Sequence, residues 1–383
     1  MRMKKIGCLV LSLLCALSLG ACSSAGDEFN EDGLKKYSEG AYTEAVSAFE
    51  KAITADNQNE EFYVNKGMAY LELEDYTNAH KAFDSALRLE GDCQAAYRGN
   101  GIAYMEEGNY ESAMQAFETA LSCQSGRVSE AEYDILLYRG ETQTRMGDYE
   151  GAEETYTVLL DTQGEKAVTY YLRGVARVKG GDAESGMEDM DKAISLNKND
   201  YDMYLNCYYC LADMDQEDLG IKYLQNALVI DEKANASHRS RGAVNFLLGD
   251  YSAALTEFEY EGETADVETL IYIGLCYQSL GDTTKSYEAF SKALANGGEN
   301  TEVYYQMGMC MFSTGDYETA LEHLQNGLAL GGGEHKQEMM YTVGLCYERQ
   351  LDFKAALKAF EEYVALYGSN EELDKEIAFL RTR

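Results

Sequence analysis

The chain has 383 residues, of which 45% are hydrophobic and 11% aromatic, and its formal net charge at pH 7 is −35. This apolar content is enough to bury a continuous core, which argues against a globally disordered chain. The negative charge repels nucleic acid and anionic lipid head groups, so we expect no nucleic-acid partner and membrane association only through an anchor. Proline is absent, so glycine is the residue available to end helices.

The N-terminus has the pattern of a secretory signal peptide over residues 1–21. Arg2, Lys4 and Lys5 precede an apolar run from residue 6 to residue 19, which is short for a transmembrane helix. The run ends in Leu-Gly-Ala-Cys at positions 19–22, which resembles the lipobox of bacterial lipoproteins. The resemblance implies that Cys22 becomes the acylated N-terminus and that residues 22–27 form a polar tether. The alternative is an ordinary signal peptide with an incidental cysteine.

These residues predict an extracytoplasmic protein that is lipid-anchored to a bacterial cell membrane. Two or three acyl chains give stable anchoring, whereas a single chain gives only marginal binding.

The remainder of the chain has an internal repeat marked by one glycine per unit, here called the repeat glycine. The successive spacings are 34, 34, 39, 34, 68, 32, 34 and 36 residues. Halving the gap of 68 places a missing glycine at Tyr208 and gives ten units. The repeat glycines are Gly33, Gly67, Gly101, Gly140, Gly174, Gly242, Gly274, Gly308 and Gly344.

Each unit resembles the tetratricopeptide repeat, a 34-residue helix-turn-helix. Small residues such as Gly101 and Ala113 are expected where two helices cross, and the turn Gly108-Asn109 ends one helix and caps the next. The resemblance implies an all-α fold, an α-solenoid superhelix of about ten repeats over residues 28–370. Residues 371–383 are predicted to form a C-terminal capping helix. The short acidic link at residues 259–263 is a candidate bend between two sub-arrays.

The sequence carries no complete catalytic or metal-binding motif, so we expect a non-enzymatic protein without cofactors or metals. Cys207 and Cys210 form a Cys-x-x-Cys, but no second cysteine pair or nearby histidine completes a zinc site. Cys210, Cys276, Cys310 and Cys346 recur two residues after the repeat glycine position and are interpreted as buried small hydrophobes. A thiol-based enzyme that uses Cys207 and Cys210 is a remote alternative.

The family resemblance also implies a binding surface, because the first helix of each repeat lines the concave face in such arrays. The implied ligand is a peptide or a partner protein, with the arginines selecting its acidic groups. A tight superhelix that buries these residues in its own packing is one alternative. A structural subunit or assembly factor of a cell-envelope complex is another. Carrying over the family's inward positions gives the candidate residues Arg98, Ile102, Met105, Arg145, Tyr171, Val175, Val178, Tyr209, Arg239, Phe246, Ile271, Leu275, Tyr305, Met309, Phe312 and Tyr341.

Overall fold

The computed structural model describes residues 24–89, 93–123, 130–231, 237–297 and 300–383, and these residues are helical with short turns. The predicted signal peptide and Cys22 lie outside the described residues. The chain divides into two compact units, unit 1 from Met1 to Gly220 and unit 2 from Ile221 to Arg383. None of the helices in the described ranges combines the length and the apolarity needed to cross a bilayer.

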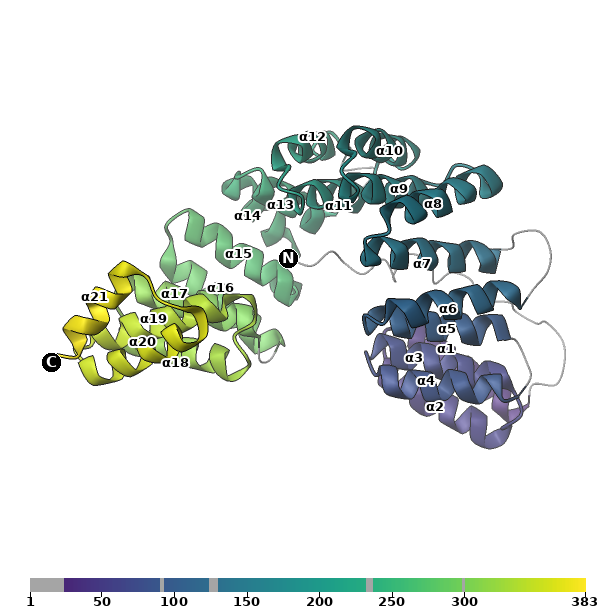
Figure 1. Cartoon of the computed structure of the whole chain (residues 1–383), viewed down its shortest axis with the longest axis horizontal. Coiled ribbons are helices and arrows are strands. Elements are labelled where there is room, and N and C mark those ends of the chain that lie inside the picture. Colours follow the sequence, from purple (N-terminus) through teal and green to yellow (C-terminus); the bar gives the residue numbers. More distant parts are fainter. Residues whose placement is uncertain (1–23, 90–92, 124–129, 232–236, 298–299) are drawn as a thin grey trace. The chain divides into compact units, whose positions relative to one another are not determined.

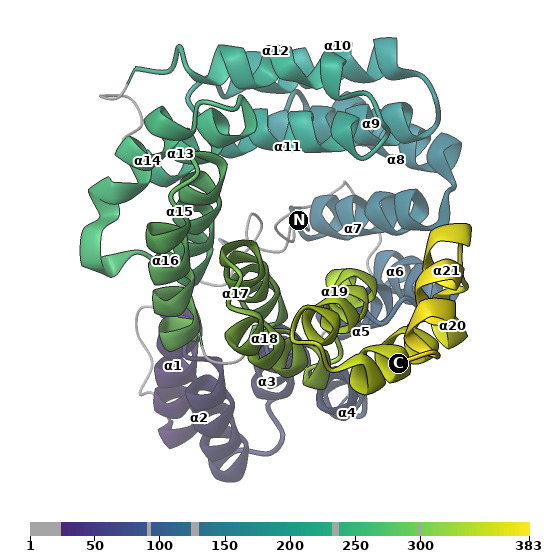
Figure 2. The same ribbon diagram turned by 90° about the vertical axis from the view of Figure 1, so that its left-hand side faces the viewer.

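Unit 1 consists of antiparallel helix pairs in which each helix packs on the next one in sequence (Figure 1). We call the odd-numbered member of a pair the first helix and the even-numbered member the second helix. Figure 2 shows second helix α10 lying alongside first helix α9. The helices are α1 (Ala25–Ser38), α2 (Tyr42–Ala55), α3 (Glu60–Glu72), α4 (Tyr76–Leu87), α5 (Cys93–Glu106), α6 (Tyr110–Ser122), α7 (Glu130–Met146), α8 (Tyr149–Gln163), α9 (Ala167–Lys179), α10 (Ala183–Leu196), α11 (Tyr201–Ala212) and α12 (Glu217–Ala227), the last of which crosses the division between the units.

Unit 2 continues the same pairing and ends in the capping helix α21 (Glu371–Leu380), which packs on the last second helix. Its helices are α13 (His238–Leu247), α14 (Tyr251–Phe258), α15 (Val267–Ser279), α16 (Thr283–Gly297), α17 (Thr301–Thr314), α18 (Tyr317–Ala329), α19 (Lys336–Arg349) and α20 (Phe353–Tyr367), with the short 3₁₀ helices η2 (Glu259–Thr264) and η3 (Gly333–His335). The described residues therefore form an all-α solenoid of ten helix pairs and a capping helix, as the sequence predicts.

The turn between the two helices of a pair confirms the predicted chemistry. Gly108 has φ +79°, a left-handed conformation that favours glycine, and Asn109 then accepts a hydrogen bond from the Ser112 amide as the cap of α6. Gly315 and Asp316 repeat this arrangement before α18. A glycine that ends one helix and a polar side chain that begins the next therefore fix the hairpin.

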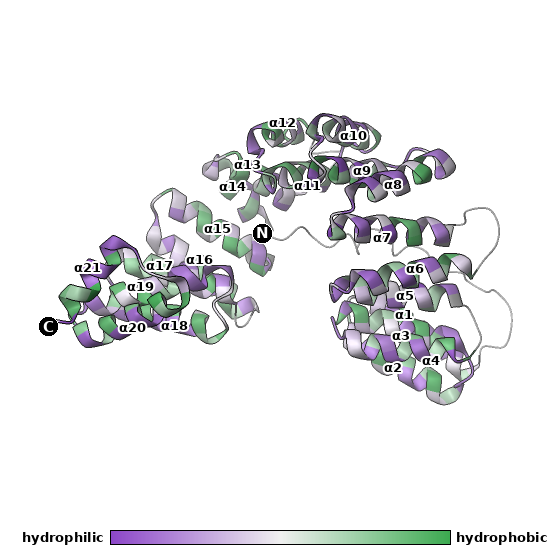
Figure 3. Ribbon diagram, viewed as in Figure 1, coloured by the Kyte–Doolittle hydropathy of each residue, from purple (hydrophilic) through white to green (hydrophobic). Residues whose placement is uncertain are grey.

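The crossing of the two helices in a pair depends on close contact between a repeat glycine and a large side chain. A Cβ placed on Gly101 would lie 2.4 Å from the fully buried ring of Phe117 on α6. The same ring contact occurs at Gly67 with Phe83. Figure 3 shows hydrophobic and hydrophilic residues alternating along these helices, since one face of each helix packs in the core.

The pair α11–α12 makes this contact in reverse. Tyr208 replaces the repeat glycine on α11, and its ring lies over Gly220 of α12, where a Cβ would be 3.0 Å from the Tyr208 Cδ2 atom. The division between the compact units falls here, at Gly220. The candidate bend at residues 259–263 is not at this division, since those residues lie in η2 inside unit 2.

The glycine–aromatic contact gives a stability prediction. Gly101→Ala should lower the free energy of unfolding by about 1–3 kcal/mol, because the added methyl group overlaps the Phe117 ring. Chemical denaturation of the full chain would measure the loss.

The matched control is the double variant Gly101→Ala, Phe117→Ala, which removes the ring that the added methyl group would meet. Without the ring the methyl group has space, so the double variant should lose less stability than the sum of the two single variants. Additive losses would show that the overlap is not the cause.

Candidate binding surface

The predicted binding residues all lie on first helices, but the two units place them in different surroundings. In unit 1, consecutive first helices contact one another from α1 through α11. Among the described helices of unit 2, such contact between first helices is close for α13 and α15 alone. The inner positions of unit 1 are consequently closed by neighbouring helices to a greater extent than those of unit 2.

The apolar candidates of unit 1 are part of its core. Ile102 and Met105 on α5 belong to the cluster that also contains Phe83 and Phe117. On α9, Tyr171 is 4% exposed and Val178 is 1% exposed. Burial raises the pKa of Tyr171 well above its ordinary value, and its hydroxyl has no hydrogen-bond partner among the described atoms. Val175 is buried as well, and Tyr209 on α11 is half-buried.

The arginines of unit 1 form ion pairs within the chain. Arg98 on α5 pairs with Asp134 on α7 and lies 5.5 Å from the centre of the Tyr138 ring. Burial raises the pKa of Asp134, and the nearby Arg98 opposes that rise. Arg145 contacts Glu141 at 2.6 Å and, on α5, Glu106 at 3.2 Å.

Arg239 in unit 2 repeats the arrangement of Arg98. It lies on α13, and its guanidinium contacts Glu268 on α15 and, at 2.9 Å, Asp266. Both arginines lie three residues before the repeat glycine of their own unit. Each pairs with an acid that lies six residues before the repeat glycine of the following unit. Sequence reasoning missed this pairing, although the recurrence of both offsets is visible in the repeat register. The three candidate arginines thus each have a carboxylate partner inside the chain.

The aromatic candidates of unit 2 are less enclosed. Tyr305 on α17 stacks on His335 with ring centres 4.0 Å apart, and His335 contacts Glu302 at 2.8 Å. Phe312 packs edge-on against Tyr317 at 5.5 Å. Tyr341 on α19 is 37% exposed. Burial together with nearby acids raises the pKa of Tyr305 and of Tyr341, which keeps both hydroxyls neutral.

Six half-buried or exposed side chains on α15, α17 and α19 are the strongest candidates for ligand contact, and this set of residues is here called the α15–α19 patch. Ile271, Leu275, Met309 and Phe312 are half-buried apolar residues. Phe246 on α13 is half-buried too, but it packs between Tyr251 and Tyr272. The patch consists of Ile271, Leu275, Tyr305, Met309, Phe312 and Tyr341.

The cysteines that the structure describes include a buried set with free thiols and the disulfide-bonded Cys123. Cys207 and Cys210 are fully buried, and burial raises the pKa of Cys210 to about 12. A thiol is a nucleophile only as thiolate, so this environment disfavours thiol catalysis. Cys123 at the end of α6 is disulfide-bonded, which sequence reasoning did not anticipate. No cluster of metal-ligating side chains occurs within the described ranges.

Comparison with known proteins identifies the repeats. Three segments match tetratricopeptide-repeat families, at residues 64–128, 167–200 and 299–369. The chain therefore contains tetratricopeptide repeats in both units, and its fold is that of a tetratricopeptide-repeat solenoid.

Individual relatives are distant. The chain is 26% identical over 143 residues to the BBSome complex member BBS4 of Bos taurus, a match that covers 37% of this chain and 27% of that protein. The crystal structure of a tetratricopeptide repeat protein from Parabacteroides merdae has a TM-score of 0.45 at 15% identity and covers 67% of this chain and 99% of its own. The structure of PilW, a type IV pilus biogenesis factor, has a TM-score of 0.47 at 16% identity. The match covers 56% of this chain and 94% of the PilW chain.

The buried thiols give a prediction about reactivity. Native Cys210 should react with iodoacetamide at pH 8 roughly 10³-fold more slowly than a solvent-exposed cysteine, because a pKa of about 12 leaves little thiolate. Mass spectrometry of the labelled protein would measure the rate, with the guanidinium-unfolded chain as the control. Rapid labelling of the native protein would instead support an accessible, reactive Cys-x-x-Cys.

Proposed function

We propose that this protein is a membrane-anchored, extracytoplasmic tetratricopeptide-repeat scaffold that binds peptide segments of partner proteins and catalyses no reaction. The observation that carries the proposal is the α15–α19 patch, in which aromatic and apolar side chains remain accessible on first helices. Apart from the half-buried Tyr209, the candidate residues of unit 1 are buried or ion-paired. Binding is therefore assigned to unit 2.

The chemistry of the patch indicates the kind of ligand. Tyr305, Phe312 and Tyr341 offer aromatic surfaces on which apolar side chains of a peptide can pack. Glu302 and Glu338 lie close enough to Tyr305 to raise its pKa, so acids border this part of the patch. A ligand with apolar anchors and basic flanking residues is favoured by these charges. Arg239 is already paired with Asp266 and Glu268 and contributes less to selection than the aromatic residues.

Two observations support the extracytoplasmic placement. The first is the N-terminal sequence itself, in which a basic and then apolar segment leads directly to Cys22. The second is the disulfide-bonded Cys123, because disulfides persist in oxidising compartments outside the cytosol. The proposed route to the membrane is acylation of Cys22, in keeping with the strongly acidic composition of the chain.

A structural role in a cell-envelope complex is the second candidate, and exposed apolar residues near the C-terminus favour it. Leu366 on α20 is 62% exposed and Phe379 on the capping helix is 42% exposed. Tyr367 beside them is 39% exposed. An end-on contact with another subunit would cover these side chains.

The patch assignment predicts the outcome of a cross-linking experiment on intact cells. A photoreactive phenylalanine at position 312 should capture a partner, and the triple variant Tyr305→Ala, Phe312→Ala, Tyr341→Ala should reduce recovery of that partner at least about tenfold. Tyr260→Ala is the control, because this tyrosine is 75% exposed and lies on η2, which contributes no residue to the patch. The structural role would be favoured if the triple variant left partner recovery unchanged and the double variant Leu366→Ser, Phe379→Ser reduced it.

The anchor proposal predicts the location of a cysteine variant. Cys22→Ser should abolish incorporation of labelled palmitate and move the protein from the membrane fraction to the soluble fraction, because the acylated side chain is removed. Cys15→Ser, which changes a cysteine inside the apolar run, should remain acylated and membrane-bound. Equal membrane retention of both variants would contradict lipid anchoring at Cys22.

A further inference from the structure

The loop between α18 and α19 is rich in glycine and longer than a 34-residue repeat requires. The repeat glycines on either side of it, Gly308 and Gly344, are 36 residues apart. Gly331, Gly332 and Gly333 have φ values of +100°, +80° and +53°, which are left-handed conformations that favour glycine. The chain therefore enters α19 through three consecutive positions with the conformational freedom of glycine.

Helix α19 lacks the side-chain cap that its neighbours have. The other α-helices from α13 to α21 follow a Ser, Asp or Asn whose side chain accepts a hydrogen bond from a backbone amide of the first turn. His335 occupies this position before α19, and its side chain makes no capping hydrogen bond. An N-cap side chain stabilises its helix, so a residue that gives up the cap is expected to have another role.

The His335 side chain instead contacts α17. Its ring is stacked on the ring of Tyr305, with an interplanar angle of 7° and ring centres 4.0 Å apart. Its Nε2 atom lies 2.8 Å from one carboxylate oxygen of Glu302, which is one turn before Tyr305. The other carboxylate oxygen of Glu302 accepts a hydrogen bond of 2.9 Å from Gln306. Glu302 is thus held in place, and His335 lies over one face of a patch residue.

The corresponding place in the last repeat has a cap instead. Tyr341 lies three residues before its repeat glycine, as Tyr305 does. The N-cap residue that follows its helix pair is Asn370, which accepts a hydrogen bond of 2.9 Å from a backbone amide of α21. The ring of Tyr341 lies against Phe360 and Tyr363 of α20, within its own pair. Capping the next helix and covering the tyrosine are therefore alternative uses of one position.

Protonation of His335 strengthens its contact with α17. A neutral imidazole donates an ordinary hydrogen bond to Glu302, whereas a protonated one adds an ion pair and places a cation over the aromatic ring. The other charged side chains of the elements around it are Glu334 on η3, and Lys336 and Glu338 on α19. Histidine changes its charge between about pH 5 and pH 8. The contact is therefore expected to be stronger at the acidic end of this range.

From these contacts we propose that residues 331–335 form a pH-sensitive cover of the α15–α19 patch, in which His335 occupies one face of Tyr305 and releases it to a ligand. The assignment of the patch to binding rests on the proposed function, whereas the covering of Tyr305 does not. Acidification holds the cover in place, because the added proton completes an ion pair with Glu302. A rise in pH weakens this contact, and the three glycines give the segment the freedom to move away.

Solvent access to Tyr305 tests the cover directly. Hydroxyl-radical footprinting of the full chain in detergent, read by mass spectrometry, measures the oxidation of Tyr305 with no ligand present. Oxidation should be about two- to threefold faster at about pH 8 than at about pH 5, because a charge-assisted contact is stronger than a neutral one. His335→Asn should raise the rate at about pH 5 at least about threefold and remove its dependence on pH.

Two variants and an internal reference serve as controls. His335→Asn should keep α19 intact, because asparagine is a preferred cap and Asn370 has this role before α21. Glu302→Gln keeps the ring stack and an uncharged acceptor, so Tyr305 should stay more protected than in His335→Asn but lose most of its dependence on pH. Oxidation of Tyr341 in the same samples should not change, and it serves to normalise the rates.

Equal oxidation of Tyr305 in the native chain and in His335→Asn would overturn the proposal, and so would a native rate that is the same at both pH values. Partner capture at position 312 tests the release to a ligand. His335→Asn should increase recovery of the captured partner about two- to threefold at about pH 5, and unchanged recovery would overturn the release. Failure of capture in the native chain and in every variant would contradict the patch assignment, while the oxidation rates would still decide whether Tyr305 is covered.

Discussion

Most helix pairs are held together by close contact between a glycine on one helix and a large side chain on the other, and the remaining packing builds on that contact. Phe117 against Gly101 and Phe360 against Gly344 are examples in which a ring fills the space of a missing Cβ. Such contact brings the two helices near enough to bury their apolar faces, and repetition of the contact places apolar core clusters along each unit. Polar residues are then free to occupy the remaining surface.

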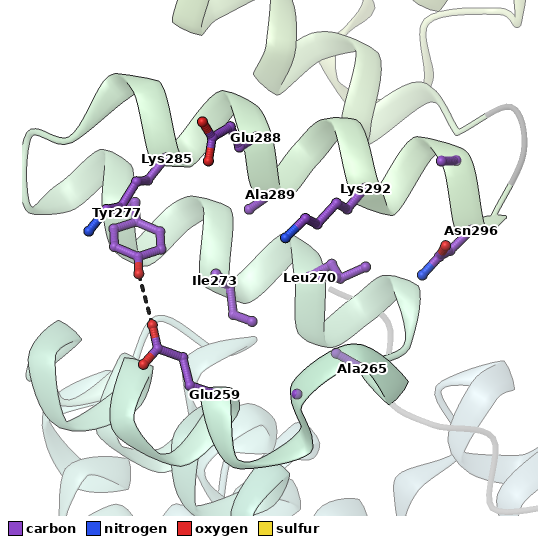
Figure 4. A pocket seen from close by; sticks show the side chains of 12 residues that line it. Glu259, Ala265, Leu270, Ile273, Tyr277, Lys285, Glu288, Ala289, Lys292 and Asn296 are labelled. Carbon is purple, nitrogen blue, oxygen red and sulfur yellow. Dashed lines mark hydrogen bonds between the residues drawn. The ribbon is translucent and has the colours of Figure 1, made fainter.

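Variation of this contact accounts for the local features of the fold. Leu324 replaces the ring opposite Gly308, and at Gly174 the nearest group is the backbone carbonyl of Gly186, followed by the Met190 side chain. At Tyr208 the large and small residues exchange helices, and the chain divides into its two compact units within the same pair. At α14 the crossing contact between Gly242 and Phe258 is kept, but the helix ends at that residue. The path of the chain after Phe258 can therefore differ from that of other second helices. Here it leaves a pocket beside α15 and α16 (Figure 4).

The inner positions of the repeats serve two different purposes. In unit 1, Arg98 and Arg145 connect successive first helices through carboxylates, and Tyr37 on α1 donates a hydrogen bond of 3.0 Å to Glu72 on α3. These contacts stabilise the array and occupy the groups that a ligand would need. In unit 2 the first helices α15, α17 and α19 are less tightly connected, so their aromatic residues stay accessible. The proposed binding function is therefore assigned to unit 2, where the first helices contact one another least.

The helix pairs, their turns and the capping helix could all be predicted from the sequence, because each depends on residues a fixed number of positions apart. The same spacing predicted the buried state of Cys210, Cys276, Cys310 and Cys346. The inner positions, by contrast, are implied by the family resemblance. Spacing could not show which inner positions are covered, since burial of Tyr171 and exposure of Tyr341 depend on how closely neighbouring helices pack in three dimensions. The pocket beside Ile273 likewise arises from a helix that ends early, and its open volume depends on three elements that the repeat spacing alone does not position.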